Sequence, residues 1–130
     1  MTSFAERRPV LADGCFDPLH IGHLNYLHAA REFGNVLVRV APDDDIRAKG
    51  REPFQSFLER RDMIQRQTYA VVNEPRTLAE TILHCRPYVL VKGMDWIGSI
   101  PADVVAACIN ANCAIAFVPT QHRSSSERLG

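Results

Sequence analysis

Residues 14–23 (GCFDPLHIGH) hold the side chains best suited to chemistry in this 130-residue chain. His20 and His23 lie three residues apart, so both imidazoles share one face of a first helical turn. Gly22 between them has no side chain and lets a ligand approach the backbone closely. The free N–H groups of a helix start favour anions. The segment therefore predicts an anion cradle suited to attack on a phosphoryl group, where charge develops on oxygen atoms.

Two other interpretations of the histidines stay open. With Cys15 as a third ligand, His20 and His23 resemble part of a zinc site, although no second ligand cluster follows in the chain. Spacing alone also fits two capping or surface residues. The chain has no Walker A motif, which excludes a P-loop enzyme. We predict no metal site built from protein side chains.

The elements that must position these residues alternate along the chain. A helix is predicted from residue 21, where apolar residues recur at helical spacing, until Gly34 and Asn35 end it. On the helix at 57–69, Leu58, Met63 and Ile64 are predicted to face inward, whereas polar residues 42–53 are predicted as a loop. The remaining predicted strands and helices follow the same pattern: strands 9–13, 36–41, 70–72, 88–91 and 114–118, and helices 77–85 and 101–112.

This alternation predicts one α/β domain over residues 1–130, a doubly wound five-stranded parallel sheet with helices on both faces. Sheets of this kind bind ligands at the carboxyl ends of their strands. The expected ligand-binding segments each follow a predicted strand: residues 14–23, 42–53, 92–99 and 119–126.

Composition limits the partners and the compartment. Fifteen basic and fifteen acidic residues give a formal net charge of zero, so we expect no nucleic acid and no anionic membrane as partner. The four cysteines form no CxxC pair, which favours a reduced, cytoplasmic protein over a redox or zinc protein. The apolar run after Arg8 is too short for a signal peptide. The longest uncharged stretch, 104–122, fits a helix and a strand better than a membrane span.

The segment 14–23, between a predicted strand and a helix, resembles the H-x-G-H signature and upstream G-x-F-D of the cytidylyltransferase-like nucleotidyltransferases. The resemblance extends over residues 10–129 and implies a Rossmann-like fold. Four further stretches resemble segments of the family. AKGREP (48–53) resembles its Lys-bearing loop, and LERR (58–61) resembles its E-x-R helix start. VKGMDW (91–96) resembles its V-x-G-x-D-W/Y segment, and PTQHRSSSERL (119–129) stands in the place of its substrate loop.

The family resemblance implies that a phosphorylated alcohol or sugar attacks the α-phosphate of a nucleoside triphosphate and that pyrophosphate leaves. It implies that His20 and His23 stabilise the transition state, that Lys49 and Arg61 contact phosphates, and that Mg²⁺ accompanies the triphosphate. It also implies a homodimer. The residues implied to bind nucleotide are Gly14, Cys15, Phe16, Asp17, Gly22, Lys92, Gly93, Asp95, Ser125 and Ser126, and those implied to contact the acceptor are Trp96, His122 and Arg123.

Taken singly, these residues also fit ordinary roles: Lys49 in a solvated loop, Arg61 on an exposed helix, Trp96 in the core and the serines in a tail. The last loop departs from the family patterns R-T-E-G-x-S-T-T and E-D-G-x-S-T-T, because Arg123 replaces the glycine and Glu127 the second threonine. This departure motivates a different hypothesis, a nucleotide-binding module without catalysis.

Two branches of the family remain open for the reaction. Two segments look closest to heptose-phosphate adenylyltransferases: Lys49-Gly50 followed by Pro53, and Val91-Lys92-Gly93. Trp96 after Asp95 looks more like glycerol-phosphate and choline-phosphate cytidylyltransferases. We expect a heptose-1-phosphate adenylyltransferase-like enzyme, with a glycerol-3-phosphate-type cytidylyltransferase as the alternative.

Overall fold

The computed structural model describes residues 8–74 and 76–119, and at its centre is a parallel sheet with strand order β3-β2-β1-β4-β5. The chain first adds β2 and β3 on one side of β1 and then returns to add β4 and β5 on the other. This order confirms the predicted doubly wound sheet and puts the reversal of strand order beside β1. The strands are β1 (Val10–Gly14), β2 (Val36–Val40), β3 (Ala70–Val71), β4 (Val89–Gly93) and β5 (Ala114–Val118).

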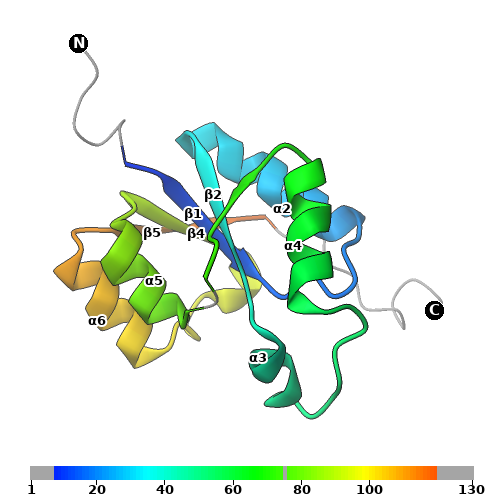
Figure 1. Ribbon diagram of the computed structural model, residues 1–130. Helices are drawn as coiled ribbons and strands as arrows, with labels where there is room; N and C mark the ends of the chain where they lie inside the picture. The colour runs from blue at the N-terminus through cyan, green and yellow to red at the C-terminus, as the bar shows by residue number, and fades with distance from the viewer. Residues whose placement is uncertain (1–7, 75, 120–130) are drawn as a thin grey trace, which may run out of the picture.

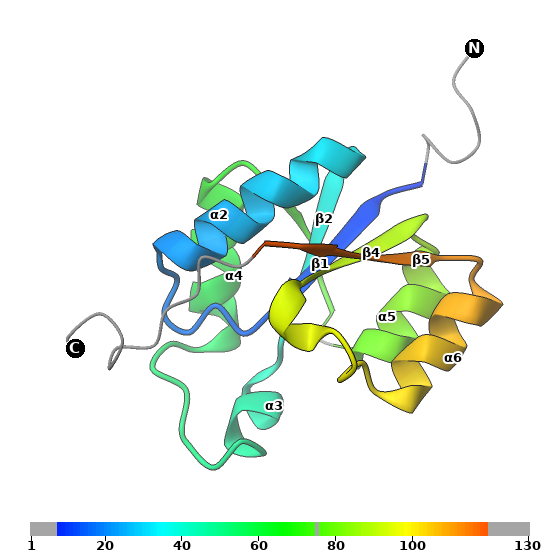
Figure 2. The same cartoon turned by 180° about the vertical axis from the view of Figure 1, so that it is seen from behind.

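Helices cover both faces of the sheet (Figures 1 and 2). One face carries α2 (Ile21–Ala30) and α4 (Phe57–Arg66), and the other carries α5 (Leu78–Cys85) and α6 (Ala102–Asn110). The 3-10 turns η1 (Arg31–Phe33) and η2 (Met94–Trp96) follow α2 and β4. No helix in residues 8–74 and 76–119 is long and apolar enough to cross a membrane.

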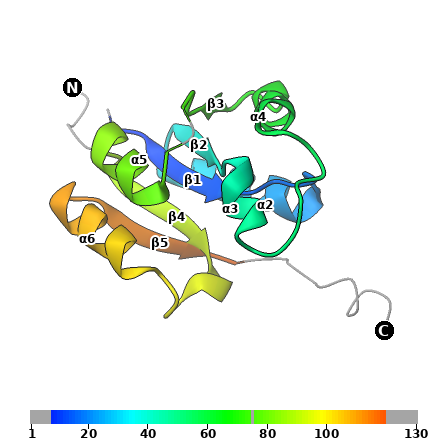
Figure 3. The same cartoon turned by 60° about the horizontal axis from the view of Figure 1, so that its bottom comes forward.

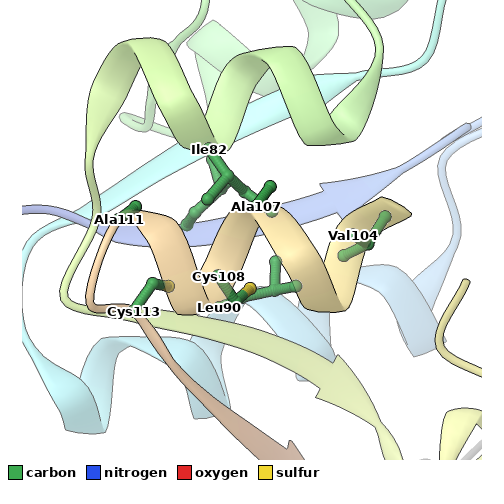
Figure 4. Packing of buried hydrophobic residues seen from close by; sticks show 8 residues of the cluster. Ile82, Leu90, Val104, Ala107, Cys108, Ala111 and Cys113 are labelled. Atoms are coloured by element: carbon green, nitrogen blue, oxygen red, sulfur yellow. The ribbon is translucent and has the colours of Figure 1, made fainter. Parts of the chain in front are cut away.

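The two faces of the sheet have separate apolar cores because side chains alternate along a strand. On β1, Leu11 packs with α5 and α6, whereas Val10 and Ala12 pack on the side of α2 and α4. All three are fully buried, as expected for the central strand of a parallel sheet. Figure 4 shows the first of these cores: Ile82 from α5 and Val104, Ala107 and Cys108 from α6 gather over Leu90 of β4. Both cores hold the carboxyl ends of the strands in fixed positions.

The segment predicted as a loop, 42–53, contains a short helix, α3 (Asp43–Arg47). Its first turn is made of three aspartates and its last turn holds Arg47, an arrangement that complements the helix dipole. Ile46 is fully buried and anchors the helix to the body of the domain. Figure 3 shows α3 beside the arrowhead of β1, at the carboxyl end of the sheet. The loop prediction was wrong here because the aspartates were counted only for their polarity.

The remaining elements match their predicted positions to within three residues at each end. On α4, however, the predicted inward face is only partly right. Ile64 is fully buried, but Leu58 is 62% exposed and Met63 36% exposed. Their place toward the interior is taken by Arg60, which is fully buried. Hydrophobicity alone placed Leu58 and Met63 wrongly because an arginine with enough partners can replace an apolar residue inside a protein.

Candidate functional site

A cavity of about 490 Å³ lies at the carboxyl ends of β1, β2 and β4, where the strand order reverses. Parallel α/β sheets bind their ligands at this position. The cavity is lined by ten of the residues singled out from the sequence: Gly14, Cys15, His20, Gly22, His23, Lys49, Lys92, Gly93, Asp95 and Trp96. The predicted segments after β1, β2 and β4 are therefore brought together.

His20 and His23 form both hydrogen bonds of a capping box at the start of α2. The N–H of Gly22 donates to His20 Nδ1 at 3.1 Å, and the N–H of His20 donates to His23 Nδ1 at 3.2 Å. The two rings stack with 3.7 Å between their centroids. A nitrogen that accepts a hydrogen bond cannot carry the proton of a neutral imidazole, so each ring carries it on Nε2. Capping therefore fixes the tautomer that makes each histidine a donor through Nε2.

Two glycines keep this arrangement open. A Cβ at Gly22 would lie 2.9 Å from His20 Cε1, and one at Gly14 would lie 2.9 Å from the ring of Phe16. Phe16 is buried, with a left-handed φ of 52°, and packs edge-on against His23 at 5.2 Å between ring centroids. Phe16 thus supports an imidazole from behind and does not line the cavity.

Asp17 also lies outside the cavity lining. Its buried carboxylate accepts hydrogen bonds from Arg51 at 2.6 Å and from the backbone N–H groups of Phe54 and Gln55. Burial by itself would raise the pKa of the Asp17 carboxyl, but these donors outweigh it and hold the pKa below its ordinary value. The structure thus gives Asp17 the role of fixing the chain between α3 and α4.

Lys49 reaches the cavity from the turn that follows α3. Its Nζ donates to the Sγ of Cys15 at 3.2 Å, so the ammonium lies against the end of β1. Two buried arginines hold α3 in place through its aspartates: Arg39 pairs with Asp45 at 3.0 Å, and Arg60 pairs with Asp43 at 2.6 Å. The position of Lys49 therefore depends on ion pairs from β2 and α4.

The two adjacent arginines of α4 have different surroundings. Arg60 donates to the carbonyl oxygens of Gln55, Cys15 and Ala41 and to the carboxylate of Asp43. Arg61, identified from the sequence as the motif arginine, does not line the cavity, and its guanidinium lies 6.0 Å from the ring of Phe57. Its buried Nε has no hydrogen-bond partner among the described residues. Of the pair, Arg60 is the one that contacts the site's backbone.

Sequence reasoning missed a buried charge network on the cavity floor. Asp13 at the end of β1 accepts from Arg39 of β2 at 2.8 Å and from Lys92 of β4 at 3.2 Å. All three side chains are at most 11% exposed. Burial disfavours the charged form of Arg39, but Asp13 and Asp45 outweigh this and raise the pKa of its guanidinium. The available signal was a charged residue inside the apolar run of β2 (VLVRV).

Tyr26 of α2, also missed, ties this floor to the histidine helix. Its hydroxyl accepts from the N–H of Asp13 at 3.0 Å and donates to the carbonyl oxygen of Val91. Burial raises the pKa of the Tyr26 hydroxyl well above its ordinary value, and the Asp13 charge adds to the shift. The tyrosine therefore stays neutral and links α2 to both β1 and β4.

Lys92 and Trp96 stand together at the exit of β4. The Lys92 ammonium lies 4.1 Å from the centroid of the Trp96 ring, a cation–π contact, while the same nitrogen donates to Asp13. Asp95 and Trp96 belong to η2 and line the cavity. Residues 8–74 and 76–119 contain no group of three or more His, Cys, Asp or Glu arranged to hold a metal ion. The predicted His122, Arg123, Ser125 and Ser126 lie outside the described residues.

Comparison with known proteins identifies the family. A family model described as cytidylyltransferase-like matches residues 11–128. The bifunctional protein HldE of Campylobacter curvus is 38% identical over 109 residues, which are 77% of this chain and 23% of that protein. The bifunctional protein HldE of Helicobacter hepaticus is 42% identical over 93 residues, 67% of this chain and 19% of that protein. The chain thus spans about a fifth of the length of these curated relatives.

A solved structure shares the fold. The lipopolysaccharide core biosynthesis protein from Thermoplasma volcanium superposes with a TM-score of 0.71 at 23% identity, covering 90% of this chain and 98% of that one. The match of the family model includes the histidine segment, the Lys49 turn and the η2 residues that meet at the cavity. The chain belongs to the cytidylyltransferase-like family of nucleotidyltransferases.

Proposed function

We propose that the chain transfers a nucleoside monophosphate from ATP or CTP to a phosphorylated sugar or polyol, most like a heptose-1-phosphate adenylyltransferase. An oxygen of the acceptor's phosphate forms a bond to the α-phosphorus of the triphosphate. The bond from that phosphorus to the β-phosphate oxygen breaks, and pyrophosphate leaves with the electron pair. The observation that carries the proposal is the stacked pair His20 and His23, held by backbone N–H groups at the cavity wall.

The histidines suit this reaction because their donors are placed before the substrate arrives. In the transition state, charge increases on the oxygens around the α-phosphorus and on the leaving oxygen. The Nε2–H groups of His20 and His23 and the N-terminus of α2 supply donors and a positive dipole end there. Donors fixed in this way need no reorganisation during the reaction, and each is worth about 10²–10³ in rate.

Lys49 adds a positive charge to the same wall. Its present partner is the thiol of Cys15, which is a weak acceptor. An ammonium therefore loses little when it leaves the sulfur for a phosphate oxygen, where the bond is charge-assisted. We propose that Lys49 holds the β- or γ-phosphate as pyrophosphate forms.

We propose that Mg²⁺ accompanies the triphosphate. This ion usually keeps several waters and combines one or two carboxylates with substrate phosphates. Asp13, Asp45 and Asp95 line the cavity. Because Asp13 and Asp45 both pair with Arg39, Asp95 is the carboxylate that would share the ion. Once bound, the ion supplies charge neutralisation at the phosphates.

The test is pyrophosphate release in the presence of Mg²⁺, with ATP and CTP each tried against heptose 1-phosphate, glycerol 3-phosphate, phosphocholine and phosphoethanolamine. Release with one pair identifies base and acceptor, and CTP with glycerol 3-phosphate would favour the cytidylyltransferase alternative. His20→Ala and His23→Ala should each lower kcat by about 10²–10³. His28→Ala is the matched control, because His28 is exposed in the last turn of the same helix.

Two negative outcomes have different meanings. Calorimetric binding of ATP or CTP without pyrophosphate release across the panel would favour the non-catalytic nucleotide-binding module. Absence of nucleotide binding together with absence of release would contradict the proposal. A pair that reacts equally well in the wild type and both histidine variants would refute the role given to the imidazoles.

The resemblance to the family also implies a homodimer, which stays a prediction. Sedimentation of the full chain tests it, because a monomer has a mass of 14.6 kDa.

A further inference from the structure

A second cavity, of about 200 Å³, adjoins the first and is not used by the reaction described above. The two cavities share Asp13, Arg39, Asp45, Lys92 and Trp96 as lining residues. The other walls of the smaller cavity come from the starts of α5 and α6: Thr77, Leu78, Ala79, Ile100, Pro101, Asp103 and Val104. A ligand whose phosphate lies near the histidines can therefore extend its other end toward α5 and α6.

The deepest carboxylate at the junction of the cavities is already neutralised. Asp13 receives Arg39 on one oxygen at 2.8 Å and Lys92 on the other at 3.2 Å. Asp13 and Arg39 are paired residues of neighbouring strands, so the parallel register itself brings the two charges together. Arg39 also bonds Asp45 and the carbonyl oxygen of Arg76, which fixes its guanidinium in place. The negative charge of Asp13 is thus already balanced by cations of the chain, so it attracts a cationic ligand only weakly.

The aromatic residue at the junction is occupied in the same way. Trp96 is the ring best suited to bind an ammonium group, and Lys92 already lies 4.1 Å from its centroid. The usual receptors for an ammonium ion, a buried carboxylate and an aromatic face, are both taken by the chain's own cations. At the junction an ammonium-bearing ligand would instead meet Arg39 and Lys92. The carboxylate of Asp103, at the start of α6, is exposed, so water screens its attraction for a cation.

We propose that Arg39 determines acceptor specificity, selecting an uncharged, hydroxyl-bearing end and rejecting an ammonium-bearing one; this rests on the proposed function, since the acceptor enters the same site. A hydroxyl group both donates and accepts hydrogen bonds. It finds N–H donors on Arg39 and Lys92 and lone pairs on Asp13 and Asp45, which line both cavities. Asp103 at the start of α6 adds a further carboxylate acceptor.

The experiment compares two phosphomonoesters that differ at the far end, glycerol 3-phosphate and phosphocholine. Their dissociation constants are measured by calorimetry, with and without an α,β-methylene analogue of ATP or CTP that cannot react, for the wild type and for Arg39→Met. Methionine fills much of the space without the charge, so Asp13 is left with Lys92 alone. We expect the wild type to prefer glycerol 3-phosphate and Arg39→Met to move the affinity ratio toward phosphocholine by about tenfold or more.

The double variant Arg39→Met with Asp13→Asn is the matched control, because it removes both charges of the pair and should move the ratio back. Arg39→Lys keeps the charge and should keep the wild-type preference. If Arg39→Met does not fold, as judged by circular dichroism, Lys92→Met provides the second variant. It removes the other cation from Asp13 and uncovers the ring of Trp96, so its ratio should move in the same direction.

An unchanged ratio in folded Arg39→Met would overturn the proposal, as would equal affinities of the wild type for the two compounds or binding of neither. Because the ratio comes from binding, it does not depend on turnover. Failure of the proposed function has a separate signature: the wild type releases no pyrophosphate, while the ratio still responds to Arg39→Met.

Discussion

Replacing Arg60 tests whether the buried arginine, rather than its neighbour Arg61, holds the site together. In the structure Arg60 is fully buried and donates to three backbone carbonyl oxygens and to Asp43. Arg60→Ala would leave the carbonyl groups of Cys15 and Ala41 and the carboxylate of Asp43 without this donor. The perturbation therefore acts at the ends of β1 and β2 and at the start of α3.

The expected cost follows from these lost partners. Breaking a buried ion pair by removing one partner costs about 3–5 kcal/mol, and each buried acceptor left unpaired costs about 1–3 kcal/mol. Asp43 is 30% exposed and regains water, so the ion-pair cost does not apply in full, and the unpaired carbonyl groups of Cys15 and Ala41 account for most of the loss. We expect Arg60→Ala to lower the free energy of unfolding by about 3 kcal/mol, a large part of the roughly 5–15 kcal/mol typical of such domains.

The assay is urea unfolding at pH 7, followed by circular dichroism and by the fluorescence of the single tryptophan. Arg61→Ala is the matched control, one residue away on the same helix. Its guanidinium makes a distant contact with Phe57, so we expect a loss below about 1 kcal/mol. Equal losses for the two variants, or a loss below about 1 kcal/mol for Arg60→Ala, would refute the reasoning from buried acceptors.

Three further predictions concern other parts of the site and core. Gly22→Ala puts a methyl group 2.9 Å from the His20 ring, so nucleotidyl transfer measured by pyrophosphate release should fall at least about tenfold while the unfolding midpoint changes little; full activity would contradict the packing argument. Asp17→Asn should cost about 2 kcal/mol at pH 7 and at pH 5. Because the pKa of this carboxyl is lower in the folded state than its unfolded value of 3.8, its contribution to the free energy of unfolding is complete above pH 3.8 and disappears as the pH falls through the lowered pKa. The stabilities of wild type and variant should therefore converge in acid unfolding. A constant difference in stability down to pH 2 would be inconsistent with this reasoning. Burial and the neighbouring Cys108 raise the pKa of the Cys113 thiol to about 12, so a disulfide reagent at pH 8 should label Cys113 only after denaturation, and mass spectrometry showing rapid labelling of the folded protein would count against its burial.

The local sequence determined the elements and the histidine motif. Strand-forming runs alternate with helical periodicity, and this order is enough to predict a parallel sheet whose strands end at a common edge. His20, Gly22 and His23 are close in the chain, so their shared helical turn could be predicted without knowing the rest of the fold. The cavity residues that come from segments 42–53 and 92–99 were also expected, since each segment follows a predicted strand.

What depended on distant contacts could not be predicted in this way. The pairing of Asp13 with Arg39 and Lys92 requires the register of three strands that are remote in sequence, and a one-residue shift would turn the side chains to the opposite face. On α4, the choice between Arg60 and Arg61 is decided by which side chain points at the carbonyl groups of β1 and β2. Residue types and spacing fixed the chemistry available to this chain. Only the tertiary structure decided which charges cancel one another at the cavity floor, because that outcome depends on distances and burial.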